Sequence, residues 1–209
     1  MLNKAMNLAT LLEKNQVYIE QYKNNELMKL IQSIEMNEAE NRVRLLDCIQ
    51  VFSNYFQKTV MLRSILTENN RFLKVAQEHL EEEFGHDLTL NHDRHDRRPT
   101  WDPILEACSC WFTWKMLVLD NYGKTFLVHL VLESSANIFF KEAHLVMKRH
   151  AETNYFQMHA VVDEHHEQMG IQLLEGLSAV DYERLLEIQQ QGWDMLNMVC
   201  TRMAELSVL

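Results

Sequence analysis

The amino-acid sequence predicts an all-α fold, because its composition, its hydrophobic spacing and its low turn content agree. The 209 residues include only 5 Gly and 2 Pro, and sheet-rich proteins need both residue types for their many turns. The good helix formers Leu, Met, Glu, Gln, Lys and Ala dominate instead. Apolar residues recur three or four positions apart through most of the chain, which is the helical period. We therefore expect one domain, residues 1–209, folded as a single bundle of about seven to eight helices.

Three helical segments are expected in the first half of the chain. The first covers roughly residues 3–34, and the polar stretch QYKNNE is a candidate break within it. The second covers about 40–67, where the apolar period is strong. The third runs from about 70 to 92, and the preceding stretch TENN offers a loop and an N-terminal cap.

The second half opens with the clearest loop of the chain, DRHDRRPTWDP at 93–103, which holds both prolines and a run of charge. Asp102 and Pro103 predict the cap and the first residue of a helix that ends near 120. The turn DNYGK, the break AETN and the turn GLSAVD separate the remaining helices. These are expected at about 124–150, at 154–175, and from the last turn to about 206.

Charge and cysteine content exclude several classes of function. The formal net charge of -10 disfavours nucleic-acid binding and docking on anionic membranes, which both need a basic surface. No stretch of 18 apolar residues and no signal-peptide pattern occur, so no membrane span is expected. Cys108 and Cys110 lack the spacing of zinc ligands. We expect a reduced, cytoplasmic protein.

One stretch, HAVVDEHH, carries a motif with the residue types of a metal site. On a helix of about 100° per residue, Asp163 and His166 leave the axis close to the direction of His159. Imidazole and carboxylate are common ligands of iron, manganese and zinc. Composition alone predicts this motif roughly 0.07 times in such a chain, so the match is informative. A solvated or hydrogen-bonded helix face is the alternative.

A second stretch, HLEEEFGHD, repeats the pattern. His79, Glu82, Glu83 and His86 share one face of the expected helix. The pair formed by Glu83 and His86 has the acid-x-x-His spacing, as does the pair at 163 and 166. Two such pairs, each beside further ligand-type residues, fit the di-metal carboxylate plan of helical bundles.

A third candidate ligand, Glu133, lies in the apolar stretch LVHLVLESSANIFF. A buried carboxylate without a partner is costly. Its partner could be a metal ion, an Arg or Lys side chain, or the hydroxyl group of Ser134 or Ser135.

The stretch HLEEEFGHD resembles the H-x-x-E-E-x-G-H-D segment of proteins with the heme-oxygenase-like fold, which include thiaminase-II-like and pyrroloquinoline-quinone synthase-like proteins. The motif at 159–166 resembles the last-helix ligand motif of the heme-oxygenase-like di-iron oxidases, and Glu133 sits where that group has a core Glu. The resemblance covers roughly residues 40–175. It implies about seven helices around a central pocket, with a cofactor assembled from ferrous ions, two of them expected, and dioxygen. The ligands that it implies are Glu83, His86, Glu133, His159, Asp163 and His166, with His79 as an additional candidate.

One position departs from the family pattern. Many members carry a Glu ligand in the sequence E-T-Y-H-Y on an earlier helix, where this chain has Gln50. Glutamine is a poorer ligand for a hard cation, so Gln50 could weaken that site or Asp47 could replace it. The aromatic residues Phe52, Trp111 and Trp114 are candidate walls of a substrate pocket.

These patterns favour an oxygen-activating nonheme iron oxidase or oxygenase, with iron or manganese as the metal and dioxygen and a small organic molecule as substrates. Two alternatives stay open. A metal-free thiaminase-like enzyme would use a cysteine nucleophile, for which Cys108 and Cys110 are candidates by residue type alone. A helical interaction protein could have kept the fold and lost the chemistry. A homodimer through an exposed apolar helix face is a further option.

Overall fold

The computed structural model describes residues 7–150 and 153–209, with the side chains of 160–165 outside the description. All regular structure in these residues is helical, and no strand occurs among them. The predicted all-α bundle is therefore confirmed. Eight α-helices of the described chain have eight or more residues, namely α1, α3, α4, α5, α6, α8, α9 and α10.

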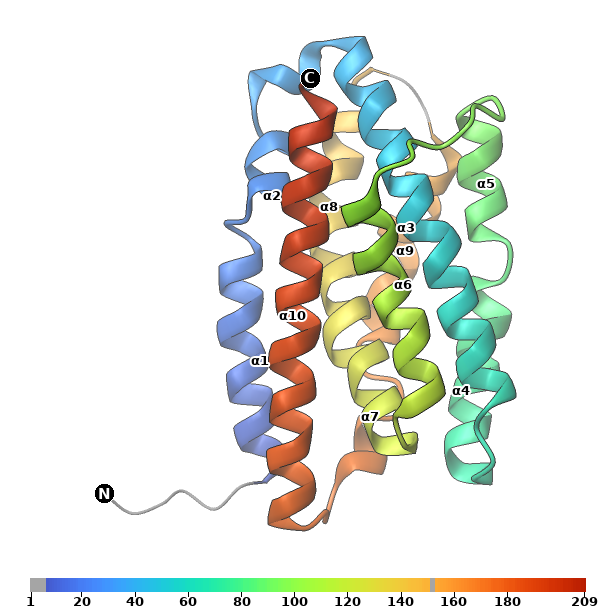
Figure 1. The fold of residues 1–209 in the computed structure, drawn as a ribbon, viewed down its shortest axis with the longest axis vertical. Helices are drawn as coiled ribbons and strands as arrows, with labels where there is room; N and C mark the ends of the chain where they lie inside the picture. Colours follow the sequence, from blue (N-terminus) through green and yellow to red (C-terminus); the bar gives the residue numbers. More distant parts are fainter. Residues whose placement is uncertain (1–6, 151–152) are drawn as a thin grey trace.

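One side of the bundle is formed by α1 (Leu8–Tyr22), α2 (Glu26–Ile31) and α10 (Ala179–Ser207) (Figure 1). The expected break at QYKNNE is present, because the side chain of Asn25 caps α2 by accepting from the Met28 N–H. A short 3-10 turn, Ile34–Asn37, then leads into α3 (Ala39–Ile65). No described helix has the length and apolarity needed to cross a membrane.

The centre of the bundle is built from α3, α6 (Pro103–Val118) and α10, which pack on one another. Asp102 caps α6 as expected, since its carboxylate accepts from the Ile104 and Leu105 N–H groups. The same carboxylate accepts two hydrogen bonds from Arg202 on α10. The loop at 93–103 is thus confirmed, and Asp102, which caps α6, also holds that helix against α10.

The helix expected at about 70–92 is interrupted, which corrects the prediction. It forms α4 (Asn70–Glu83) and α5 (His86–Asp93), separated at Gly85. Gly85 has φ 88°, a left-handed conformation that other residues rarely adopt. Its N–H donates to Gln57 Oε1 at 2.8 Å. His86 consequently begins a new helix and does not share a helical face with His79 and Glu83.

The helix expected at 124–150 begins earlier and contains a widened turn. α7 (Asn121–Phe126) starts inside DNYGK, where Asp120 caps it, and continues through a π-helical turn, Leu127–Glu133, into α8 (Ser134–Met147). The helix expected at 154–175 is shorter than predicted, because α9 (Asn154–His166) ends before Gly170 at φ 75° and the 3-10 turn Ile171–Leu174. Single π turns are frequent at functional sites, and this one carries Glu133.

The π turn packs closely against the middle of α10, at Gly192. A Cβ atom at Gly192 would lie 2.7 Å from Leu127 Cδ1 and 3.2 Å from Val131 Cγ1. Both contacted side chains are fully buried, so they have little room to move. A glycine is therefore required for this helix crossing.

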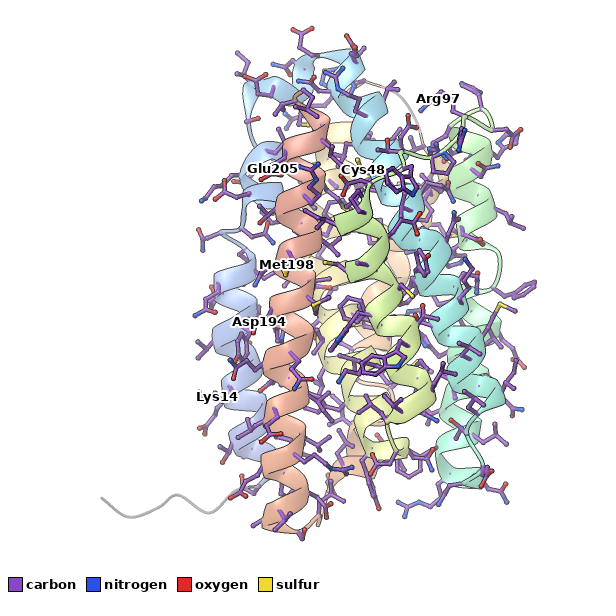
Figure 2. All side chains as sticks on the ribbon, in the orientation of Figure 1. Lys14, Cys48, Arg97, Asp194, Met198 and Glu205 are labelled. Carbon is purple, nitrogen blue, oxygen red and sulfur yellow. The ribbon has the colours of Figure 1, made fainter. Side chains whose placement is uncertain are left out.

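We expect Gly192→Val to lower the free energy of unfolding by roughly 2 kcal/mol, since overpacking a core contact typically costs ~1–3 kcal/mol and outweighs the few tenths of a kcal/mol that valine gains over glycine in helix propensity. Asp194→Val is the matched control on the exposed side of α10, where Figure 2 labels Asp194. It should cost less than about 1 kcal/mol, the ordinary difference in helix propensity. Urea denaturation followed by circular dichroism measures both. Equal losses for the two variants would contradict the close packing.

Candidate metal centre

Two clusters of histidine and carboxylate side chains lie inside the bundle and share Glu83. The first holds His79, Glu83, Glu133 and His166, and the second holds Glu83, His86 and His159. Within each cluster the candidate ligand atoms all lie within 4.8 Å of one another. These residues come from α4, α5, the π turn and α9, so segments far apart in the sequence meet at one carboxylate.

The first cluster is fully enclosed. His79 Nε2 lies 2.9 Å from Glu133 Oε1. His166 Nδ1 lies 3.2 Å from Glu83 Oε1 and 3.4 Å from Glu133 Oε2. These four side chains are at most 3% exposed, so their interactions are screened little by solvent.

The second cluster lies beside the first, on the other oxygen of Glu83. His86 Nδ1 is 2.9 Å from Glu83 Oε2 and 3.2 Å from His159 Nε2. His159 Nε2 is 3.9 Å from the same carboxylate oxygen. The Nδ1–H of His159 donates to the Tyr155 carbonyl at 2.8 Å, which leaves the lone pair of Nε2 facing the cluster. The ring also stacks on Phe140, with centroids 4.2 Å apart.

Glu82 contacts the ring nitrogen of His166 that faces away from the cluster. Its Oε2 atom lies 2.8 Å from His166 Nε2, so only Nδ1 of that ring faces Glu83 and Glu133. Histidine ligands of metals commonly make such a hydrogen bond through their other nitrogen. The sequence placed Glu82 on the ligand face, and the structure gives it this orienting contact instead.

Burial and hydrogen bonding set the charges of the cluster. Burial alone would raise the pKa of Glu83, but hydrogen bonds from His166 and His86 hold it well below its usual range. Glu133 behaves similarly, since His79 and His166 lower its pKa against the effect of burial. Burial would lower the pKa of His166, but its hydrogen bonds to Glu133 and Glu83 raise it to about 11. Burial lowers the pKa of His159.

The residues present fit a metal centre. Nδ1 of His79 is buried without a hydrogen-bond partner among the described residues, and an unsatisfied buried polar atom is costly. The donor set of imidazole nitrogen and carboxylate oxygen suits iron, manganese and zinc. A cation between the two clusters would also neutralise the buried carboxylates.

The other predicted ligands lie elsewhere or outside the description. The oxygen atoms of Asp47 and Gln50 accept hydrogen bonds from the buried side chain of Arg94, at 2.9 and 3.1 Å. A second cation, Arg97, also binds Asp47. Asp47 belongs to neither cluster of the described chain, and the side-chain oxygens of both Asp47 and Gln50 are engaged by a guanidinium group. The side chain of Asp163 lies outside the described residues.

Among the described residues, the partners of Glu133 are neither the serine hydroxyl groups nor an Arg or Lys side chain, which the sequence left open. Ser134 donates to the His129 carbonyl and Ser135 to the Leu132 carbonyl. Glu133 instead pairs with His79 and His166. The cost of burying this carboxylate is thus offset by two imidazoles in the candidate centre.

An apolar cavity of about 70 Å³ opens onto Glu83, Glu133 and His159. That volume is several times the space that one water molecule requires. Phe52 lines it as expected, whereas Trp111 and Trp114 do not. Trp111 packs on Phe112, and Trp114 is 48% exposed. Most of the wall comes from aliphatic and aromatic side chains, including Phe52, Phe56, Leu132, Phe139, Phe140 and Met203.

His129 is a buried residue of the site that the sequence did not single out. Its Nδ1–H donates to the His166 carbonyl at 2.8 Å, and its Nε2 accepts from Arg63 Nη1 at 2.7 Å. Burial, followed by the charge of Arg63, lowers the pKa of His129 well below its ordinary value. The available signal was its position four residues before Glu133 in an apolar helix, where both side chains can reach the same side.

In the metal-free protein we expect the two buried histidines to differ in protonation at pH 8. The pKa of His166 is raised to about 11, so its ring should carry both protons, whereas His129 should be neutral. A raised pKa stabilises the fold fully below the unfolded value, and this contribution is lost as the pH rises through about 11. Ring nitrogen chemical shifts measured by NMR, assigned with His166→Gln, test this. A neutral pattern for His166 at pH 8 would contradict it.

Comparison with known proteins identifies the fold and a relative. No family model matches the chain. It is 36% identical over 195 residues to uncharacterized protein RP592 of Rickettsia prowazekii (strain Madrid E), covering 93% of each chain. A domain of unknown function with a heme oxygenase-like fold from Shewanella denitrificans OS217 superposes with a TM-score of 0.73 at 14% identity, covering 97% of this chain and 94% of that one. A TenA homolog from Pseudomonas syringae pv. tomato str. DC3000 gives 0.67 at 13% identity, covering 90% and 93%. The chain thus has the heme-oxygenase-like fold and belongs to the same family as the Rickettsia protein.

Proposed function

We propose that this protein is an oxygen-activating nonheme di-iron oxidase or oxygenase that acts on a small organic substrate. The observation that carries the proposal is Glu83, a buried carboxylate shared by two clusters of nitrogen and oxygen ligands at the wall of an apolar cavity. A carboxylate between two ligand groups is the arrangement of di-metal centres in helical bundles. The heme-oxygenase-like fold is compatible with this function but does not establish it.

The two clusters divide the ligands between two ions. His79, Glu133 and His166 would hold one ion and His86 and His159 the other, with Glu83 between them. Manganese accepts the same ligands, so the ligand set does not select iron by itself. When bound, two ferrous ions supply the electrons for reducing dioxygen at the cavity wall.

The protein's own residues orient these ligands and exclude water. Glu82 and the Tyr155 carbonyl fix the rings of His166 and His159, so that one nitrogen of each faces the cluster. The apolar wall keeps water from competing for the site. It also favours a substrate whose bulk is uncharged, because the described residues that line the cavity include no Lys or Arg.

The thiaminase-like alternative rests on the likeness to the TenA homolog and needs a reactive cysteine. Cys108 is buried and Cys110 exposed, and neither lines the cavity. Cys200 does line it. Burial raises the pKa of the Cys200 thiol to about 12, which disfavours the thiolate needed for nucleophilic attack. The cavity chemistry therefore supports the metal-dependent reaction better.

Anaerobic loading with ferrous iron should give about two irons per chain, and exposure to air should then consume oxygen. Glu83→Gln should lower the bound iron to one or less, because the shared carboxylate becomes a neutral amide. Glu81→Gln is the matched control, since Glu81 is exposed on the same helix. Metal content is measured by mass spectrometry and oxygen uptake with an electrode.

Two outcomes would reject the proposal. One is wild-type protein that binds no iron under these conditions. The other is iron content that is equal in the Glu83 and Glu81 variants. Activity on a thiamine-like heterocycle that is lost on thiol alkylation and needs no metal would favour the thiaminase-like alternative. If His159→Ala leaves both the metal content and the biological activity unchanged, an interaction protein is favoured.

A further inference from the structure

Arg63 is a buried cation that lacks an ion-pair partner among the described residues. It lies on α3 and is 1% exposed. Its Nη1 atom donates to His129 Nε2 at 2.7 Å, and its Nη2 atom lies 3.5 Å from Thr125 Oγ1. Burying a guanidinium group without a carboxylate contact is expensive. Its position therefore requires another source of compensation.

The compensation comes from the candidate metal centre on the other side of His129. Burial lowers the pKa of Arg63 to about 9, while the negative charge of Glu133 opposes that shift. Arg63 thus remains charged at neutral pH. One neutral imidazole separates its charge from the first cluster, since the His129 ring lies 5.0 Å from the His79 ring.

His129 also connects Arg63 to the end of α9. The His166 carbonyl belongs to the last residue of that helix, where carbonyl groups lack helical partners. It accepts from His129 Nδ1 at 2.8 Å and from the Met169 N–H at 3.3 Å. Arg63, His129 and the backbone of a candidate ligand thus form one hydrogen-bonded chain.

We infer that Arg63 is a positioning residue of the metal centre. Its side chain holds the His166 segment through His129, and its fixed positive charge weakens the binding of divalent cations. This inference rests on the proposed function. In the metal-free protein the charge helps to balance the buried carboxylate of Glu133. When cations bind, the same charge repels them, because Coulomb interactions act over several ångströms in a buried site.

The test is a titration of the metal-free protein with Co²⁺, followed by visible absorption and calorimetry. Arg63→Gln keeps a donor for His129 and removes the charge. It should bind Co²⁺ about tenfold more tightly than wild type, while the metal-free variant melts at a lower temperature. Arg63→Lys retains the charge and should stay within about threefold of wild type. A merely structural role would lower both stability and Co²⁺ affinity.

Thr125→Asp provides an independent route to the same result. Thr125 is buried beside the guanidinium group, so an aspartate there should pair with Arg63 and cancel its field without removing the side chain. This variant should also bind Co²⁺ about tenfold more tightly, and it decides the question if Arg63→Gln fails to fold.

The inference is overturned if Arg63→Gln and Thr125→Asp fold but bind Co²⁺ with an affinity equal to or lower than that of the wild type. That result differs from a failure of the proposed function, in which the wild-type protein itself would bind no Co²⁺ at these residues. If the wild type binds Co²⁺ tightly and Arg63→Gln binds it with the same affinity, the metal centre is supported and only the role of Arg63 is rejected.

Discussion

The burial of the Glu83 and Glu133 carboxylates inside an apolar helical bundle is the constraint on which the rest of the structure depends. Both side chains are at most 3% exposed, and buried carboxylates are stable only with partners. Histidines on α4, α5 and α9 supply these partners. Arg63 adds a positive charge behind His129. The number of imidazole groups gathered around Glu83 and Glu133 is difficult to explain by packing alone. Bound cations would explain it readily.

Two irregularities of the backbone bring these residues together. Gly85 ends α4 directly after Glu83 and starts α5 with His86, so neighbouring residues approach the centre from different helices. The π turn at Leu127–Glu133 carries both His129 and Glu133, and it passes α10 at Gly192, where a side chain has no space. Both features depart from ideal helical geometry at the candidate site, where such departures are expected.

The sequence predicted the helical architecture well because hydrophobic period and capping residues are local signals. Asn25, Gly85 and Asp102 mark helix ends in the structure. The sequence indicated a break in the stretch that holds Asn25 and a cap at Asp102, but it gave no such indication at Gly85. A single glycine within a strong helical period was not enough to predict the interruption at Gly85. The candidate site was partly predictable, since Glu83 and His86 stand at acid-x-x-His spacing and His159 and His166 belong to one motif. The contacts of Glu82, His129 and Arg94 could not be predicted, because they depend on how distant helices pack. Arg94 instead engages the side-chain oxygens of Gln50 and Asp47.

The most direct test of the account is a crystal structure of the iron-loaded protein with anomalous diffraction data collected at the iron absorption edge. The account predicts two iron peaks on opposite oxygens of Glu83, one beside His79 and His166 and the other beside His86 and His159. A structure that shows no iron at Glu83, with His166 still hydrogen-bonded to both buried carboxylates, would contradict the metal centre and assign the clusters a structural role.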